Sequence, residues 1–123
     1  MADINSVAKQ FTDFYYQTFD ADRKGLAALY RDMSMMTWEG VQVTGAVGIV
    51  DKLVSLPFQR IQHKVTTIDA QPSLPGTETM IICVTGQLLI DEETQPQQFT
   101  QMFQLVNDNG FFVYNDIFRL NYA

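Results

Sequence analysis

Hydrophobic positions in the first half of the chain recur with helical spacing. Apolar side chains lie three or four residues apart over residues 4–18 and more briefly over residues 23–30. A third run of the same kind follows Gly45 and stops at Pro57, where a helix cannot continue because proline lacks the N–H that the helix needs. We therefore predict three helices, each with one apolar face.

The other segments alternate between apolar and polar residues with a period of two, which is typical of β-strands. Glu39-Gly40 is expected to join the first two strands in a hairpin, and Asn107–Gly110 the last two, since Asn and Gly tolerate positive φ. In residues 77–90 apolar side chains occupy both faces, so we expect both faces to be partly covered. The predicted strands are residues 33–38, 41–43, 58–69, 77–90, 98–106 and 111–122.

The order of these segments is two helices, two strands, one helix and four strands. Long consecutive strands behind grouped helices predict an α+β fold, with the helices on one face of a bent antiparallel sheet. The 123 residues fit one domain, 1–123, and contain no repeat, linker or low-complexity stretch.

Charge is distributed unevenly along the chain. Residues 1–64 carry seven acidic and seven basic side chains, whereas residues 65–123 carry seven acids and one base, Arg119. Proteins bind nucleic acid and anionic membranes largely through Lys and Arg, so both partners are disfavoured. A partner with basic groups is favoured instead.

Composition limits other classes of function as well. No apolar run approaches the roughly 18 residues of a membrane span, and residues 1–10 lack the pattern of a secretory signal. The single cysteine, Cys83, excludes an intramolecular disulfide and is typical of a reducing compartment. One cysteine and one histidine leave no zinc-binding set. An all-carboxylate metal site stays open as an alternative, but no loop shows its spacing, and we expect no metal and no cofactor.

Two side chains could serve as a general base. His63 is the only histidine, and it is either a base or donor in a pocket or a half-buried imidazole satisfied by a neighbour. Asp116 lies within an apolar strand and is expected to point inward, where it could act as a base, pair with Arg119 or cap a turn.

Other carboxylates could bind a partner. Asp91-Glu92-Glu93 is either a solvated turn or one side of a site for Lys or Arg, and Trp38-Glu39 is either core or the mouth of a pocket.

Several segments resemble the nuclear transport factor 2 family, in order and over essentially the whole chain. The ending Arg119–Tyr122 resembles the fungal and plant members. This resemblance implies a cone-like roll of three helices on a strongly bent, mostly antiparallel sheet, which dimerises through the sheet. The matching segments are Phe14-Tyr15-Tyr16, Phe19-Asp20, Thr37-Trp38-Glu39-Gly40, Ser55-Leu56-Pro57-Phe58-Gln59, Ile61-Gln62-His63, Gln71-Pro72 and Asn115-Asp116-Ile117-Phe118-Arg119-Leu120.

The resemblance also implies a function. Family members are non-enzymatic carriers that bring the GDP-bound form of the small GTPase Ran into the nucleus and bind FxFG repeats of nuclear pore proteins. The chain is therefore expected in cytoplasm and nucleus, concentrated at the nuclear envelope and pore. A switch-II phenylalanine of Ran enters a hydrophobic cavity in the family, and its basic flanks pair with acids on the rim.

The resemblance places these sites on particular residues. The rim positions are Glu39, Asp91 and Glu93, and the FxFG position is Ile4, where the family has an aromatic residue. The cavity positions are Trp38, Leu56, Ile61, His63, Met102, Ile117 and Phe118. Two alternatives remain: a small-molecule dehydratase or isomerase of the cone fold, like scytalone dehydratase or ketosteroid isomerase, using His63 or Asp116, and a dimeric peptide-binding module that does not bind Ran.

Overall fold

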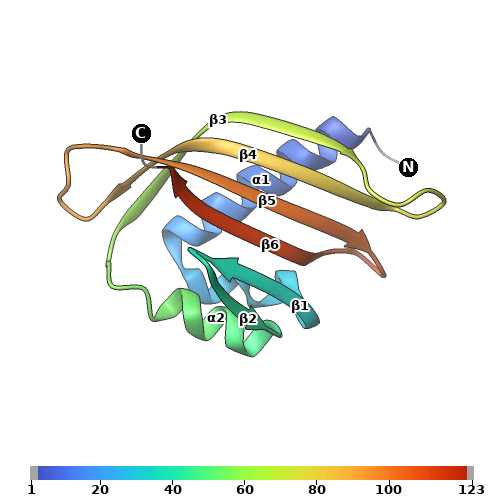
Figure 1. The fold of residues 1–123 in the computed structure, drawn as a ribbon, viewed down its shortest axis with the longest axis horizontal. Coiled ribbons are helices and arrows are strands. Elements are labelled where there is room, and N and C mark those ends of the chain that lie inside the picture. The colour runs from blue at the N-terminus through green and yellow to red at the C-terminus, as the bar shows by residue number, and fades with distance from the viewer. Residues whose placement is uncertain (1–2, 122–123) are drawn as a thin grey trace.

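The fold is an α+β roll in which three helices lie against one six-stranded sheet, as the sequence predicts. The computed structural model describes residues 3–121. The elements in chain order (Figure 1) are α1 (Ile4–Ala21), η1 (Arg23–Leu29), β1 (Tyr30–Trp38), β2 (Val41–Thr44), α2 (Ala46–Val54), β3 (Ile61–Pro72), β4 (Thr79–Ile90), β5 (Gln97–Asn107) and β6 (Phe111–Asn121).

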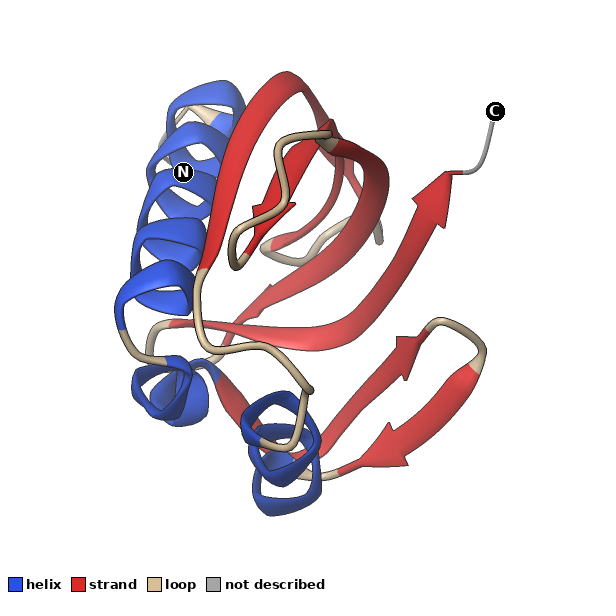
Figure 2. Cartoon of the chain, turned by 90° about the vertical axis from the view of Figure 1, so that its left-hand side faces the viewer, coloured by secondary structure: helices blue, strands red, loops and turns tan. Residues whose placement is uncertain are grey.

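The strands form a single curled sheet in the order β2-β1-β6-β5-β4-β3. Neighbouring strands are antiparallel except β1 and β6, which pair in parallel. Figure 2 shows the strong curl of the long strands, with the helices gathered on one side. We call the side that carries the helices the inner face and the opposite side the outer face. No helix within residues 3–121 is long and apolar enough to cross a membrane.

The helices differ from the prediction at their ends. Helix α1 continues past residue 18 to Ala21, because Phe19 is buried on the same apolar face as Tyr15 and Tyr16. Asp3 caps its start, with its carboxylate accepting the N–H of Ser6 at 3.2 Å. The second helix is a 3₁₀ helix rather than an α-helix, and it ends at Leu29 because Tyr30 is already in the extended strand β1.

Strand β3 contains a β-bulge that the alternation of its sequence does not reveal. Its pairing with β4 shifts between Val65 and Thr67. Before the bulge the odd-numbered residues Ile61, His63 and Val65 are less exposed than their neighbours, and after it the even-numbered Ile68 is. The bulge therefore switches which residues of β3 face inward. The strand also begins at Ile61 rather than at residue 58. For the last strand, the predicted Tyr122 lies outside the described residues.

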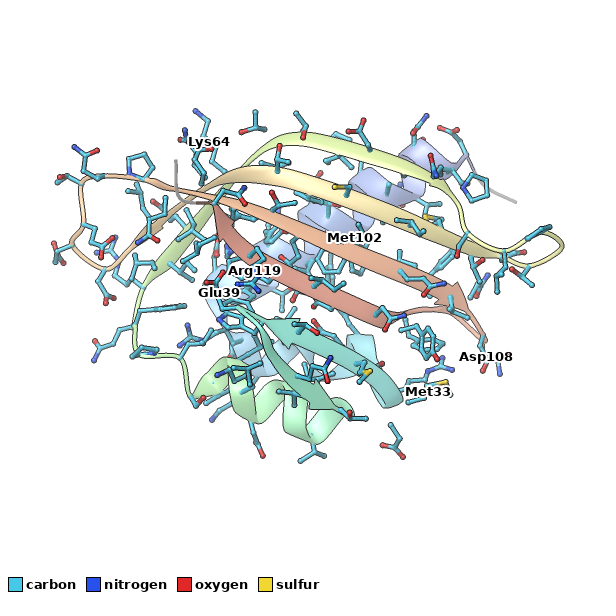
Figure 3. The ribbon with its side chains drawn as sticks, viewed as in Figure 1. Met33, Glu39, Lys64, Met102, Asp108 and Arg119 are labelled. Carbon is cyan, nitrogen blue, oxygen red and sulfur yellow. The ribbon has the colours of Figure 1, made fainter. Side chains whose placement is uncertain are left out.

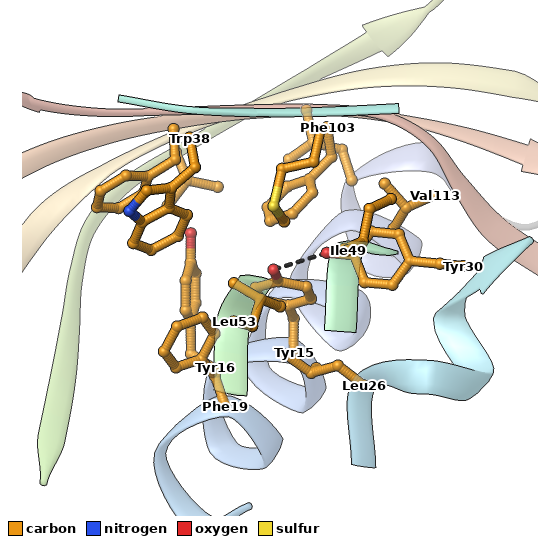
Figure 4. Close-up of a cluster of buried hydrophobic side chains, with 14 of the residues drawn as sticks. Tyr15, Tyr16, Phe19, Leu26, Tyr30, Trp38, Ile49, Leu53, Phe103 and Val113 are labelled. Atoms are coloured by element: carbon orange, nitrogen blue, oxygen red, sulfur yellow. Dashed lines mark hydrogen bonds between the residues drawn. The ribbon is translucent and has the colours of Figure 1, made fainter. Parts of the chain in front are cut away.

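The core lies between the inner face and the helices. It is rich in aromatic rings, among them Tyr15 and Phe19 from α1 and Phe103 from β5 (Figure 4). The rings of Tyr15 and Phe103 meet edge to face with their centroids 4.7 Å apart. This packing fixes the helices against the sheet and leaves the end of the roll near Trp38 to form a site.

Candidate functional site

An apolar cavity of about 340 Å³ opens at the end of the roll near the β1–β2 hairpin. Its walls come from the ends of β1, β3, β4, β5 and β6 and from the segment that links α2 to β3. Apart from one glutamine, every lining residue is apolar. The lining residues are Trp38, Leu56, Pro57, Phe58, Ile61, Leu88, Ile90, Gln97, Phe118 and Leu120.

One wall of this cavity is a stack of aromatic rings. Trp38 lies nearly parallel to Phe118, with ring centroids 4.0 Å apart and planes 8° apart. Phe19 from α1 stacks behind Trp38 at 6.2 Å. Because Trp38 and Phe118 sit side by side on paired strands, the sheet itself holds this wall flat.

Leu56, Pro57 and Phe58 form another wall, and they belong to the segment from Ser55 to Arg60, which we call the lip. It contains no helix or strand. Arg23 stacks over the ring of Phe58, with its guanidinium carbon 4.8 Å from the ring centroid, and donates to the Phe58 carbonyl at 3.1 Å. A second hollow, of about 530 Å³, lies along the lip and is also lined by Asp91 and Glu92.

Glu39 lies beside the aromatic wall. It is the first residue of the β1–β2 turn, and its carboxylate accepts a hydrogen bond from the N–H of Leu120, a cavity residue. Its own N–H donates to the carbonyl of Phe118 at 3.1 Å. Figure 3 shows Glu39 next to Arg119 at this end of the sheet.

Asp91 lies beside the lip. One carboxylate oxygen, Oδ1, accepts the N–H groups of Gln59 at 2.9 Å and Arg60 at 2.8 Å. These two backbone hydrogen bonds lower the pKa of the Asp91 carboxyl below its usual value, so the group is ionised at neutral pH. Glu93, the third predicted rim residue, is exposed and accepts a hydrogen bond from Gln97 at 3.3 Å.

The structure brings four of the seven predicted cavity residues together in the cavity wall: Trp38, Leu56, Ile61 and Phe118. Leu88 and Ile90, which the alternation of β4 places on the inner face, also line it. Pro57, Phe58, Gln97 and Leu120 complete the lining, and none of them was expected there from the sequence. Pro57 and Phe58 follow Leu56 in the sequence, Leu120 follows Phe118 on the same face of β6, and Gln97 donates a hydrogen bond to the predicted rim residue Glu93.

The prediction that Met102 and Ile117 line the cavity is wrong. They are paired with each other across β5 and β6 and lie on the outer face, 41% and 47% exposed. The neighbours Gln101, Phe103, Asp116 and Phe118 take the inner positions, so side chains between them must point outward. Figure 3 shows Met102 on the side of the sheet away from α1.

His63 is on the inner face but does not line the cavity. Its ring is fully buried between Tyr16, Phe19 and Phe99, and its Nδ1 lies 2.6 Å from Oδ1 of Asp20. Asp20 also accepts the backbone N–H of His63 at 2.9 Å. Among the described residues Nε2 has no hydrogen-bond partner. The geometry therefore matches the expectation of an imidazole held by a neighbour.

Asp116 points inward, as expected, but lies in the core rather than in the cavity. Its carboxylate accepts hydrogen bonds from Tyr30 at 2.7 Å, Gln101 at 2.8 Å and Tyr15 at 3.3 Å, and Arg119 is not among its partners. Burial raises the pKa of Asp116 to about 6, although these three donors oppose the shift. Burial and the nearby carboxylate together raise the pKa values of Tyr15 and Tyr30 well above the usual value.

The outer face carries apolar side chains that no element of the described chain covers. Besides Met102 and Ile117, Met35 is 40% exposed, and Cys83 pairs with Met102 across β4 and β5. Within residues 3–121 no group of three or more His, Cys, Asp or Glu side chains is arranged to hold a metal ion.

Comparison with known proteins assigns the chain to a family. Residues 7–120 match the model of the nuclear transport factor 2 (NTF2) domain. The chain is 58% identical to nuclear transport factor 2 of Schizosaccharomyces pombe over 124 aligned positions, covering 100% of both chains.

The solved structures agree. That of nuclear transport factor 2 from Cryptosporidium parvum superimposes with a TM-score of 0.88 at 44% identity, covering 96% of this chain and 94% of that one. A hexachlorocyclohexane dehydrochlorinase from Novosphingobium barchaimii, at 17% identity, a TM-score of 0.77 and coverage of 96% and 87%, shares the fold alone.

Proposed function

The chain belongs to the nuclear transport factor 2 domain family, and from this premise we propose that it acts in nuclear transport, as a non-enzymatic import carrier for the GDP-bound form of Ran. The observation that carries the proposal is the apolar cavity beside which Glu39 and Asp91 lie. The named relatives are transport factors, and the cavity has the chemistry that one exposed aromatic residue with basic neighbours would need.

The size of the cavity supports a single aromatic guest. An engineered apolar cavity of about 150 Å³ binds benzene, and this cavity of about 340 Å³ is open at one end. Burying a phenylalanine ring supplies roughly 1.5–3 kcal/mol, whereas an exposed ion pair adds about 0.2–1 kcal/mol. The cavity would give most of the affinity, and the acids would give orientation and a faster encounter.

The preference for GDP would follow from the conformation of Ran. A carrier that recognises a switch-II phenylalanine need not touch the nucleotide, provided that only the GDP form presents the ring. Nucleotide exchange would then release the carrier in the nucleus. The chain would pass between cytoplasm and nucleus and concentrate at the pore, where FxFG repeats bind near Ile4, a half-buried residue at the start of α1.

We propose that the chain is a homodimer that pairs through the outer face. The uncovered side chains of Met35, Met102 and Ile117 lie on three adjacent strands, β1, β5 and β6, of this face. Apolar groups rimmed by polar ones are typical of protein interfaces. Pairing through the outer face would not cover the cavity, which lies on the inner side of the sheet. Such a dimer would therefore present two open cavities.

Neither residue of the alternative enzymatic hypothesis is placed for catalysis in the cavity. His63 and Asp116 are buried outside its lining and are held by partners within the chain. The peptide-binding alternative is separable by experiment, because such a module would bind FxFG peptides and fail to bind Ran-GDP.

The proposal is tested by replacing Glu39 with lysine. We expect Glu39→Lys to abolish Ran-GDP binding in a calorimetric titration, because a cation at the rim repels the basic flanks of the guest. Asp51→Lys is the matched control, since Asp51 is an exposed acid on α2 outside the cavity lining and the change in net charge is the same. Undiminished binding by Glu39→Lys would refute the proposed role of the rim.

A further inference from the structure

The two acids beside the cavity share an unusual backbone conformation. Glu39 has a φ of 50° and Asp91 a φ of 51°, in the left-handed region that residues with a side chain seldom adopt. Such a conformation costs free energy and persists only where the surrounding structure holds it. In both residues what holds it is a set of hydrogen bonds to the backbone of a cavity wall.

Asp91 ties down the lip. Its Oδ1 accepts two consecutive N–H groups, those of Gln59 and Arg60, and its own N–H donates to the Arg60 carbonyl at 2.9 Å. The lip has no strand or helix to hold it. Three hydrogen bonds from a single residue therefore fix its backbone directly after the cavity residues Leu56 and Phe58.

Glu39 does the same on the aromatic wall. Its carboxylate accepts the N–H of Leu120, and its backbone N–H donates to the carbonyl of Phe118. Leu120 and Phe118 both line the cavity. Within residues 3–121 the hydrogen bonds of the two acids use Oδ1 of Asp91 and Oε1 of Glu39, so that Oδ2 and Oε2 have no partner in the described chain.

We infer that Asp91 and Glu39 are positioning residues that hold two walls of the cavity through one carboxylate oxygen each, while the other oxygen is left for a basic group of the guest. The first role, holding the cavity walls, follows from these hydrogen bonds alone. The second role, toward the guest, rests on the proposed function. In each acid one carboxylate thus supplies both the negative charge and the hydrogen bonds to the cavity wall. A substitution that removes the carboxylate removes the charge and these hydrogen bonds together.

The inference is tested with pairs of variants that separate charge from the hydrogen bond. Asp91→Asn keeps an oxygen that can accept the two N–H groups but loses the charge, whereas Asp91→Gly loses both. Asn and Gly tolerate the left-handed backbone, so neither variant adds strain. Glu39→Gln and Glu39→Gly form the second pair. Asn109→Gly is the control, because Asn109 is also left-handed, with a φ of 57°, and lies in the distant β5–β6 turn.

The main measurement is amide hydrogen exchange by NMR. We expect the N–H groups of Gln59 and Arg60 to exchange at least about tenfold faster in Asp91→Gly and to stay close to the native rate in Asp91→Asn and Asn109→Gly. The N–H of Leu120 should respond in the same way to Glu39→Gly and not to Glu39→Gln. Native exchange rates in both glycine variants would overturn the inference.

Affinity for Ran-GDP supplies the second measurement. Asp91→Asn and Asp91→Gly lack the same charge, so a several-fold weaker affinity of the glycine variant reports the tie to the lip, and equal affinities would contradict its role in binding. If the native chain does not bind Ran-GDP, the proposed function fails, while the exchange rates still decide whether the acids hold the walls.

Discussion

Asp116 is a carboxylic acid in the middle of an aromatic core, 1% exposed and surrounded by donors from three elements. Tyr15 comes from α1, Tyr30 from β1 and Gln101 from β5, so the carboxylate joins the first helix to the sheet at two strands. The hydroxyls of Tyr15 and Tyr30 also contact each other at 2.8 Å (Figure 4). The network is satisfied, yet burial still disfavours the charged form.

The stability of the protein should therefore depend on pH through Asp116. Its pKa is about 6 in the folded chain against 3.8 as the ordinary value, so the folded state holds the proton more tightly. Protonation of Asp116 therefore adds to the free energy of unfolding. This stabilisation, about 3 kcal/mol in total, is complete below pH 3.8 and is lost as pH rises through 6. In Asp116→Asn it should vanish.

The measurement is the free energy of unfolding by denaturant for the native chain and Asp116→Asn between pH 4 and pH 7.5. The variant should gain stability relative to the native chain as pH rises through this interval. A difference that does not change with pH would show that Asp116 does not titrate in the fold as described.

The resemblance to the family placed Met102 and Ile117 in the cavity, and the buried side chains of Gln101 and Asp116 show why both point outward instead. In β5 the amide is buried and the apolar Met102 is exposed, which reverses the usual preference. The reversal occurs because Gln101 donates to Asp116 and accepts from Tyr16 at 2.7 Å. A sequence shows a polar residue but not its buried partners, which come from segments distant along the chain.

At the scale of elements, the helices and strands could be predicted because each carries a clear period and recognisable ends. The hairpin at Glu39-Gly40 and the turn at Asn107–Gly110 form where expected. The bulge in β3 could not be predicted, since β3 itself contains no glycine, and its single proline, Pro72, lies at its far end. The one local signal is in the partner strand, at Gly86, which pairs with Val65 beside the bulge.

Replacing Gly86 with alanine should destabilise the fold. A Cβ at this position would collide with the carbonyl oxygen of Lys64 and come within 3.1 Å of the Cα of Val65, both backbone atoms that cannot move aside cheaply. We expect a loss of about 1–3 kcal/mol in the free energy of unfolding. Gly76→Ala is the comparison, because Gly76 has open space around it and only its positive φ opposes a side chain. Equal losses in the two variants would contradict a steric role for Gly86.

At the scale of the molecule, the resemblance of the sequence to a family gave the cone-like roll, and the pattern of elements alone gave only helices on one face of a bent sheet. The curl that closes the cavity arises from pairings such as β1 with β6, whose partners are separated by most of the chain. Periodicity carries no information on such pairings. Likewise the outer face was expected to be partly covered. Only the register of the strands shows which of its residues are exposed.

The proposed dimerisation through the outer face should depend on Ile117. An acid in place of this 47% exposed side chain would bring two charges into an apolar interface. We expect Ile117→Asp to shift the chain toward monomer in light scattering coupled to size exclusion. Val47→Asp is the control, because Val47 is an exposed apolar residue on α2. A dimer that survives Ile117→Asp unchanged would place the interface elsewhere.

We propose that the apolar cavity and its two acids recognise the GDP-bound form of Ran. The most direct test is a calorimetric titration of the native chain with Ran-GDP and, in parallel, with Ran-GTP, at low and at high salt. We expect binding of the GDP form alone, with an affinity that falls as salt screens the acids. Equal binding of both forms, or no binding of Ran-GDP at low salt, would contradict it.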